Sequence, residues 1–211
     1  MEDGVDLTII EAVLFDMDGT LVDSDAAVER AWRVWAAEYA ADPAAVLAVA
    51  HGAPAERTVR LIRPDLTEAG VAQAAARQLS LQYDDLSDVV ATPGTPELLA
   101  ALRLPWAVVT SADVRLAKAR LGAAGITPPL LITVEDIRAG KPDPEGYLRA
   151  AELLGVAPER CLVVEDAEVG VTAGRAAGAQ VAALKGVDGD LSIADLGTLT
   201  GLLAAAGKAR A

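Results

Sequence analysis

Acidic side chains stand in pairs at two points of this sequence, and each pair follows a short apolar run. The first pair is Asp16 and Asp18, and the second is Glu165 and Asp166. Carboxylates placed so close together repel one another, and a divalent cation relieves that repulsion. Because hard oxygen ligands favour Mg²⁺, the two pairs indicate a magnesium site. Solvated acids at a turn are the alternative interpretation of the first pair.

The first pair can also divide the work of an acid–base reaction. Asp16 and Asp18 are two residues apart, so in an extended segment their side chains point the same way. One carboxylate can stay ionised and attack, while the other holds a proton and gives it to a leaving oxygen. Gly19 allows the chain to turn freely just after them.

Two further polar clusters have chemistry suited to an anion. Thr110 and Ser111 follow an apolar run, and their hydroxyl and backbone N–H groups can bind phosphoryl oxygens. Capping of a helix is the alternative role for such residues. Lys141 stands between Gly140 and Pro142, and its ammonium can hold a phosphate and offset the acids. The alternative is an exposed loop lysine.

The elements that must position these residues are short, continuous apolar runs. Runs without alternation are typical of strands buried on both faces of a parallel sheet. The runs are residues 12–15, 106–109, 130–132, 161–164 and 181–184. Helical segments separate the later runs, so the sequence predicts an α/β fold with a doubly wound, Rossmann-like parallel sheet. In such a sheet the carboxyl ends of the strands face one crevice, where ligands bind.

Several helix boundaries can be predicted from capping residues. Thr95 and Asp143 are each followed by proline and glutamate, which predicts that they are N-caps. Gly155 is predicted to end the second of these helices. In a third helix, Gly170 and Gly174 share one face, which allows this helix to lie close to the sheet.

Residues 25–91 interrupt the alternation, and we expect them to form an all-helical domain inserted into a core of residues 1–24 and 92–211. An apolar stripe at helical spacing consists of Val28, Trp32, Trp35 and Tyr39. Core packing is the preferred role of its tryptophans, and a ligand platform is the alternative. Further helical stretches are 44–50, 55–63 and 67–83.

Composition limits the partners and the location. The formal net charge of −13 over 211 residues disfavours nucleic acid and anionic membranes, whose phosphates need lysine and arginine. A small anionic substrate stays open, because one local cation can dominate a pocket. The acidic start lacks the basic residues of a secretory signal, and no apolar run reaches the roughly 20 residues of a membrane span. We expect a cytoplasmic protein, a monomer or weak dimer.

These residues resemble four motifs of the haloacid dehalogenase superfamily of phosphatases. Residues 16–24 are similar to the first motif and residues 110–111 to the second. Lys141 resembles the third motif, and residues 164–167 with Gly170 resemble the fourth. The motifs follow in the family's order, an insert follows the first one, and the resemblance covers nearly the whole chain.

The resemblance implies a phosphatase that acts on a small phosphate ester. Asp16 would form an aspartyl-phosphate, and Asp18 would act first as general acid and then as general base. Ser111 and Lys141 would hold the phosphoryl group, with Thr110 beside them.

The resemblance also implies a cofactor and a role for the insert. Mg²⁺ would be bound by the Asp16 side chain, the Asp18 backbone carbonyl and Asp166, with Glu165 as a further ligand. The helical insert, residues 25–91, would be a mobile cap that closes over the core and selects the substrate.

A narrower resemblance is to bacterial sugar phosphatases that act on hexose and hexitol phosphates. Residues 27–32, the turn at residues 51–52 and residues 141–147 are similar to segments of those enzymes. In this cap, His51 falls where the family's substrate-specificity loop lies, and Arg57 belongs to the same segment. Both are candidate substrate contacts.

Other functions differ from a phosphatase in the residues that they need. Sugar phosphomutases of the superfamily carry a histidine shortly after the first motif, and residues 25–30 have none. A dehalogenase needs neither the acid at Asp18 nor a metal. A phosphonate hydrolase would have a lysine in the cap, and residues 25–90 contain none. A non-catalytic phosphometabolite-binding protein would be free to lose Asp18 or Lys141.

Overall fold

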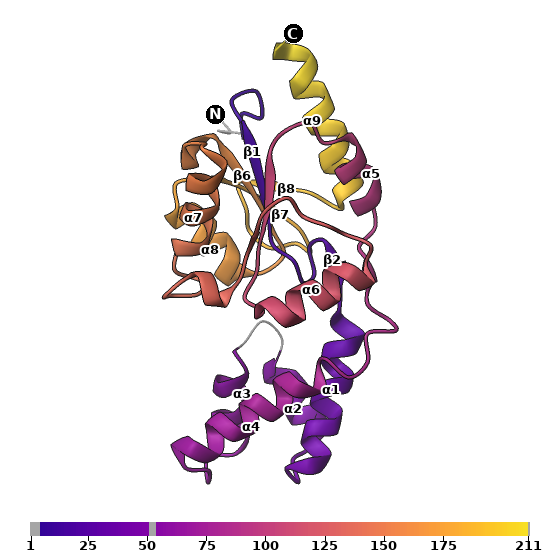
Figure 1. The fold of residues 1–211 in the computed structure, drawn as a ribbon, viewed down its shortest axis with the longest axis vertical. Helices are drawn as coiled ribbons and strands as arrows, with labels where there is room; N and C mark the ends of the chain where they lie inside the picture. The colour runs from indigo at the N-terminus through magenta and orange to yellow at the C-terminus, as the bar shows by residue number, and fades with distance from the viewer. Residues whose placement is uncertain (1–4, 51–53, 211) are drawn as a thin grey trace. The chain divides into compact units, whose positions relative to one another are not determined.

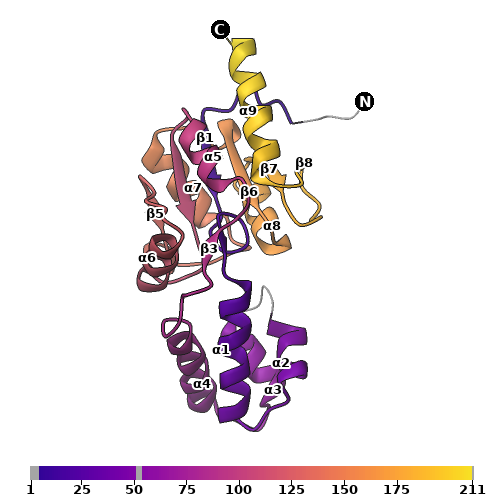
Figure 2. The same cartoon turned by 90° about the vertical axis from the view of Figure 1, so that its right-hand side faces the viewer.

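The chain forms two compact units. The computed structural model describes residues 5–50 and 54–210. One unit consists of residues 1–23 and 90–211, and the other of residues 24–89 (Figures 1 and 2).

The first unit is built on a parallel sheet of six strands in the order β5-β4-β1-β6-β7-β8. The strands are β1 (Ala12–Phe15), β4 (Trp106–Val109), β5 (Leu131–Ile132), β6 (Cys161–Glu165), β7 (Gln180–Ala183) and β8 (Leu191–Ser192). The five predicted strands are confirmed, as is the α/β fold class. The first strand lies in the middle of the sheet, where Val13 is paired with Trp106 on one side and with Leu162 on the other.

Helices cover both faces of this sheet. They are α5 (Thr95–Ala101), α6 (Val114–Ala123), α7 (Glu145–Leu154), α8 (Glu168–Ala176) and α9 (Leu196–Arg210), with short 3₁₀ turns at Val134–Asp136 and Pro158–Arg160. Helices α7 and α8 lie on one side of the sheet, and α5 and α9 lie on the other (Figure 1). The C-terminal segment, which the sequence assigned to the core, forms helix α9 of the first unit.

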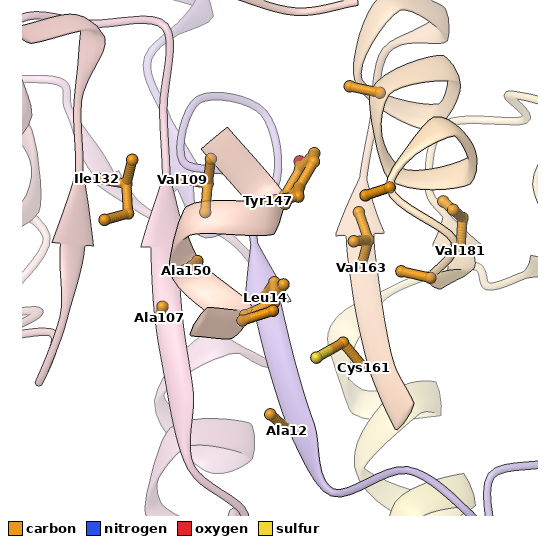
Figure 3. Packing of buried hydrophobic residues seen from close by; sticks show 14 of the residues in the cluster. Ala12, Leu14, Ala107, Val109, Ile132, Tyr147, Ala150, Cys161, Val163 and Val181 are labelled. Atoms are coloured by element: carbon orange, nitrogen blue, oxygen red, sulfur yellow. The ribbon is translucent and has the colours of Figure 1, made fainter. Parts of the chain in front are cut away.

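Small side chains allow α7 and α8 to approach the sheet closely. Tyr147 and Ala150 of α7 pack over Leu14 and Ala107 in one buried cluster (Figure 3). A Cβ added at Gly174 of α8 would lie 2.9 Å from the Val181 side chain, which confirms the predicted close contact. Gly155 ends α7 with a positive φ of 70°, also as predicted.

Two predicted N-caps were wrong by one residue. The N-cap of α5 is Gly94, and Thr95 is the first helical residue. The Thr95 hydroxyl is buried and is engaged in tertiary hydrogen bonds, so it does not cap the helix. Helix α7 begins at Glu145 with Pro144 as N-cap. Asp143 stands one residue earlier, where its Oδ1 accepts a hydrogen bond from the Glu145 N–H at 2.9 Å.

The second unit is helical, and its described residues contain no strand, as expected from the sequence. Its helices are α1 (Asp25–Glu38), α2 (Pro43–Ala50), α3 (Ala55–Ile62) and α4 (Glu68–Leu81). Trp35 is fully buried, donates its Nε1–H to the Ala74 carbonyl at 2.9 Å, and stacks on Tyr39. Trp32 meets Trp35 edge to face. The tryptophans therefore pack the core of this unit.

A two-stranded antiparallel ribbon marks the points where the chain leaves the first unit and returns to it. It consists of β2 (Val22–Asp23) and β3 (Val90–Ala91). Thr92, just after the ribbon, donates its hydroxyl to the Thr20 carbonyl at 2.5 Å. This hydrogen bond ties the segment after β3 to the loop that carries the first acidic pair. In the described part of the chain, no helix has both the length and the apolar character needed to cross a membrane.

Candidate active site

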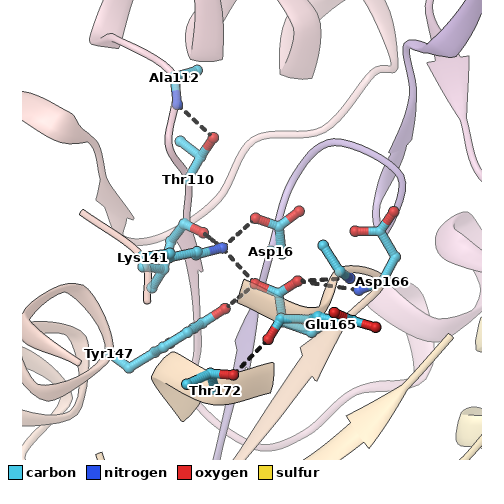
Figure 4. Close-up of polar contacts among 11 residues, drawn as sticks. Asp16, Thr110, Ala112, Lys141, Tyr147, Glu165, Asp166 and Thr172 are labelled. Atoms are coloured by element: carbon cyan, nitrogen blue, oxygen red, sulfur yellow. Dashed lines mark hydrogen bonds and ion pairs between the residues drawn. The ribbon is translucent and has the colours of Figure 1, made fainter. Parts of the chain in front are cut away.

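Three carboxylates meet at the carboxyl ends of β1 and β6. Asp16 directly follows β1, Glu165 ends β6, and Asp166 comes next. Each can offer one oxygen such that these oxygens lie within 4.8 Å of one another (Figure 4). Parallel pairing of the two strands brings these residues together although they are far apart in sequence. All-oxygen donors of this kind suit a hard divalent cation, so the residues present fit Mg²⁺.

Lys141 reaches this cluster from the loop before α7. Its Nζ donates to an oxygen of Asp16, to Oε1 of Glu165 at 2.6 Å and to the Val109 carbonyl at 3.1 Å. Burial alone would lower the pKa of the Lys141 ammonium, but the Asp16 and Glu165 charges raise it well above its ordinary value. The lysine is therefore a fixed positive charge in contact with Asp16.

The surroundings of Asp16 disfavour its ionised form. Burial raises the pKa of the Asp16 carboxyl well above its ordinary value, and the Glu165 and Asp166 charges raise it further. Lys141 opposes this effect without cancelling it. A divalent cation beside the carboxylates would favour the ionised form of Asp16 that nucleophilic attack requires.

Glu165 is held by protein donors on both of its oxygens. Oε1 accepts the Tyr147 hydroxyl at 2.7 Å in addition to Lys141. Oε2 accepts the backbone N–H groups of Asp166 and Ala167 at 3.1 and 3.4 Å. The side chain is 1% exposed. This geometry fixes the position of Lys141, so Glu165 orients the ammonium in addition to contributing an oxygen to the acidic cluster.

Tyr147 and Lys185 join the site without having been predicted. Tyr147 lies in the first turn of α7, and a tyrosine just after the lysine loop was the available signal. The Nζ of Lys185 lies 3.0 Å from Oδ2 of Asp166, and Lys185 follows β7 just as the predicted site residues follow their strands. Burial raises the pKa of the Asp166 carboxyl, whereas Lys185 lowers it.

A tight turn brings the first acidic loop against Asp166. Gly19 has a φ of 82°, and a Cβ there would lie 2.0 Å from Oδ2 of Asp166. Both the left-handed conformation and the close approach require glycine.

The side chain of Asp18 has a different partner from that of Asp16. Its Oδ1 lies 2.8 Å from a guanidinium nitrogen of Arg120 in α6. Arg120 was not among the predicted residues. The available signal was an arginine in line with Leu116, Ala117 and Leu121, which form the buried face of that helix.

The remaining predicted residues lie elsewhere. Thr110 directly follows β4 with its side chain buried, and its hydroxyl accepts the Ala112 N–H at 3.0 Å. Ser111, the next residue, is exposed. Arg57 is exposed on α3 of the second unit. His51 lies outside the described residues. Binding of phosphate or substrate by these residues stays a prediction.

Comparison with known proteins places the chain in a family. Residues 10–178 match the family of haloacid dehalogenase-like hydrolases. The chain belongs to this family. Hexitol phosphatase A of Escherichia coli is 43% identical over 175 residues, which is 81% of each chain. The 2-deoxyglucose-6-phosphate phosphatase 1 of Saccharomyces cerevisiae is 36% identical over 188 residues, covering 79% of this chain and 76% of the yeast enzyme. The family expected from the motifs is thus confirmed.

Solved structures of this hydrolase family share the fold. A beta-phosphoglucomutase from Clostridium difficile superposes with a TM-score of 0.80, covering 95% of this chain and 98% of the mutase. At 19% identity this likeness concerns the fold alone. Among the relatives named here, those with the higher sequence identity are phosphatases of sugars and polyols.

Proposed function

We propose that this hydrolase is a Mg²⁺-dependent phosphatase that releases phosphate from a sugar or polyol phosphate through an aspartyl-phosphate at Asp16. The observation that carries the proposal is the buried Asp16 carboxylate in contact with Lys141, with Asp166 close enough to share a cation. The names of the relatives, a hexitol phosphatase and a deoxyglucose-6-phosphate phosphatase, support the substrate class. The net charge of −13 also favours a small substrate over a nucleic acid.

The side chains of Asp16 and Asp166 and the backbone carbonyl of Asp18 would hold Mg²⁺, with Glu165 beside them. When bound, the ion neutralises charge on the nonbridging phosphoryl oxygens. Lys141 contributes a second positive charge to the same region, fixed by Glu165 and Tyr147. Ser111 and Thr110 would complete the phosphate-binding end of β4.

The chemistry then takes two displacements. A carboxylate oxygen of Asp16 attacks phosphorus, and the bond from phosphorus to the sugar oxygen breaks. Asp18 gives its proton to that leaving oxygen. In the second displacement Asp18 takes a proton from water as the water oxygen attacks the same phosphorus. Inorganic phosphate leaves, and the Asp16 carboxylate is restored. Hydrolysis of such esters calls for accelerations of up to about 10²¹, so these effects must act together.

We further propose that the helical unit is the cap that selects the substrate. Its segment around His51 and its exposed Arg57 would contact the sugar. Reaction in the cytoplasm by a monomer or weak dimer completes the proposal.

The test is phosphate release from a panel of hexitol, hexose and glycerol phosphates, each with Mg²⁺ and with EDTA. Asp16→Asn is the key variant, and Asp188→Asn is its matched control because Asp188 is 96% exposed. We expect turnover that needs Mg²⁺, survives in the control and vanishes in Asp16→Asn. Retained turnover by Asp16→Asn, in a preparation free of host phosphatases, would refute the mechanism. Isomerised sugar phosphate in place of inorganic phosphate would identify a mutase.

A further inference from the structure

A buried arginine is tied to the side chain that the proposed mechanism uses as acid and base. Arg120 lies on the inward face of α6 and its side chain is 3% exposed. A guanidinium nitrogen of this residue lies 2.8 Å from Oδ1 of Asp18. Removing a guanidinium from water costs several kcal/mol unless charge and hydrogen bonds compensate. Lys118 of the same helix is exposed, which is the usual position of a charged side chain.

The backbone around Asp18 is fixed independently of this ion pair. The Gly19 N–H donates to the Val22 carbonyl at 2.7 Å, and the Leu21 N–H donates to the Met17 carbonyl at 2.9 Å. The turn therefore determines where the Asp18 Cα lies, and rotation about its side-chain bonds is the freedom that remains. An ion pair with a buried, immobile partner removes much of that freedom.

The Asp18 side chain is paired with Arg120 but stays partly exposed. One oxygen faces Arg120, yet the Asp18 side chain keeps 32% of its surface exposed. The ion pair therefore does not bury the Asp18 side chain. An acid that must meet a leaving oxygen needs this kind of accessible, directed placement.

We propose that Arg120 is a positioning residue that holds one oxygen of Asp18, so that the other oxygen meets the leaving group. This inference rests on the proposed function, in which Asp18 transfers the proton. A positioning role and a purely structural role of Arg120 predict different results. Loss of an arginine that only supports the fold would slow every substrate alike. Loss of a residue that positions Asp18 slows the first displacement only for substrates whose leaving oxygen needs a proton.

The experiment compares single-turnover release of the leaving group from two substrates, followed by rapid quench. One is the hexitol or hexose phosphate that the wild type hydrolyses fastest, whose alkoxide leaving group needs protonation. The other is p-nitrophenyl phosphate, whose phenolate leaves as a stable anion. The variants are Arg120→Met, Arg120→Lys, Asp18→Asn and the double variant Asp18→Asn with Arg120→Met. Lys118→Met is the control on the same helix. Thermal unfolding reports whether each variant is folded.

We expect Arg120→Met to lower the single-turnover rate of leaving-group release, which reports the first displacement, by about 100-fold for the sugar phosphate, the lower range of a general-acid contribution. For p-nitrophenyl phosphate the loss in this first displacement should stay below about fivefold, since its leaving group needs no proton. The second displacement, in which Asp18 acts as base, is common to both substrates and should slow equally for both. Arg120→Lys should recover part of the loss. In the Asp18→Asn background, Arg120→Met should cause no further loss, because its effect passes through Asp18.

An equal loss on both substrates in the first displacement, or a further loss in the Asp18→Asn background, would overturn the inference and assign Arg120 a structural role. If Arg120→Met does not fold, Arg120→Lys carries the same comparison. A wild type without Mg²⁺-dependent release from either substrate would overturn the proposed function itself. Wild-type turnover with no difference between substrates in the variants would overturn the role of Arg120 alone.

Discussion

Gly170 of α8 lies directly over the carboxylate of Glu165. A Cβ built at Gly170 would lie 1.8 Å from Oε1 and 2.3 Å from Oε2 of Glu165. No rotation of a methyl group relieves such an overlap, so Gly170→Ala must displace either the helix or the glutamate. The glutamate is the residue that fixes Lys141 beside Asp16. The substitution should therefore disturb the fold and the site together.

The size of the effect follows from the contacts that would be lost. Breaking a buried ion pair costs about 3–5 kcal/mol, and displacement of Glu165 removes its contacts with Lys141 and Tyr147. Alanine in place of glycine in a helix returns at most about 1 kcal/mol. We expect a net destabilisation of about 2–4 kcal/mol. At about 2–4 °C per kcal/mol for a chain of this size, the Tm should fall by roughly 5–15 °C.

The assay is thermal unfolding in EDTA, followed by kcat with Mg²⁺. Gly201→Ala is the matched control, since Gly201 lies in α9 and a Cβ there would meet no atom within 4 Å. The control should be unchanged in activity and equal or higher in Tm. A Gly170→Ala protein whose Tm equals that of the control and that retains full activity would refute the packing argument.

Two further predictions concern residues away from the catalytic loop. Trp35→Phe removes the buried hydrogen bond from Nε1 to the Ala74 carbonyl, so denaturant unfolding should show a loss of about 1–3 kcal/mol, and an unchanged midpoint would contradict it. Burial raises the pKa of the Cys161 thiol to about 11. Because an unfolded thiol ionises near pH 8.5, this group's contribution to stability falls as the pH rises from about 8 toward 11. In the native protein at pH 8, Cys161 should resist iodoacetamide and react only on unfolding, which mass spectrometry of the alkylated protein would show.

The positions of strands were predictable where the sequence pattern was local. Residues 161–164 form a continuous apolar run, and they form β6 because a strand buried on both faces needs no polar positions. The same reasoning failed for β8, since two residues carry no periodicity. It also failed for the N-cap of α5, because Thr95 uses its hydroxyl in tertiary contacts that no capping rule contains.

Residues at the ends of strands were predictable as a group, but their partners were not. Lys141 and Asp16 are separated by 125 positions, and parallel pairing of distant strands brings their elements together. Arg120, Tyr147 and Lys185 contact site residues only because the elements that carry them pack together.

By itself the sequence determined the family, the α/β core, the helical insert and the acidic and basic residues at the carboxyl ends of the strands. These features depend on residue type and short-range periodicity, which act along the chain. The tertiary structure alone decided that Glu165 holds Lys141, that Asp18 faces Arg120 and that Gly170 must remain small. Such choices arise where elements distant in sequence pack to native density, and there each contact is set by the whole fold.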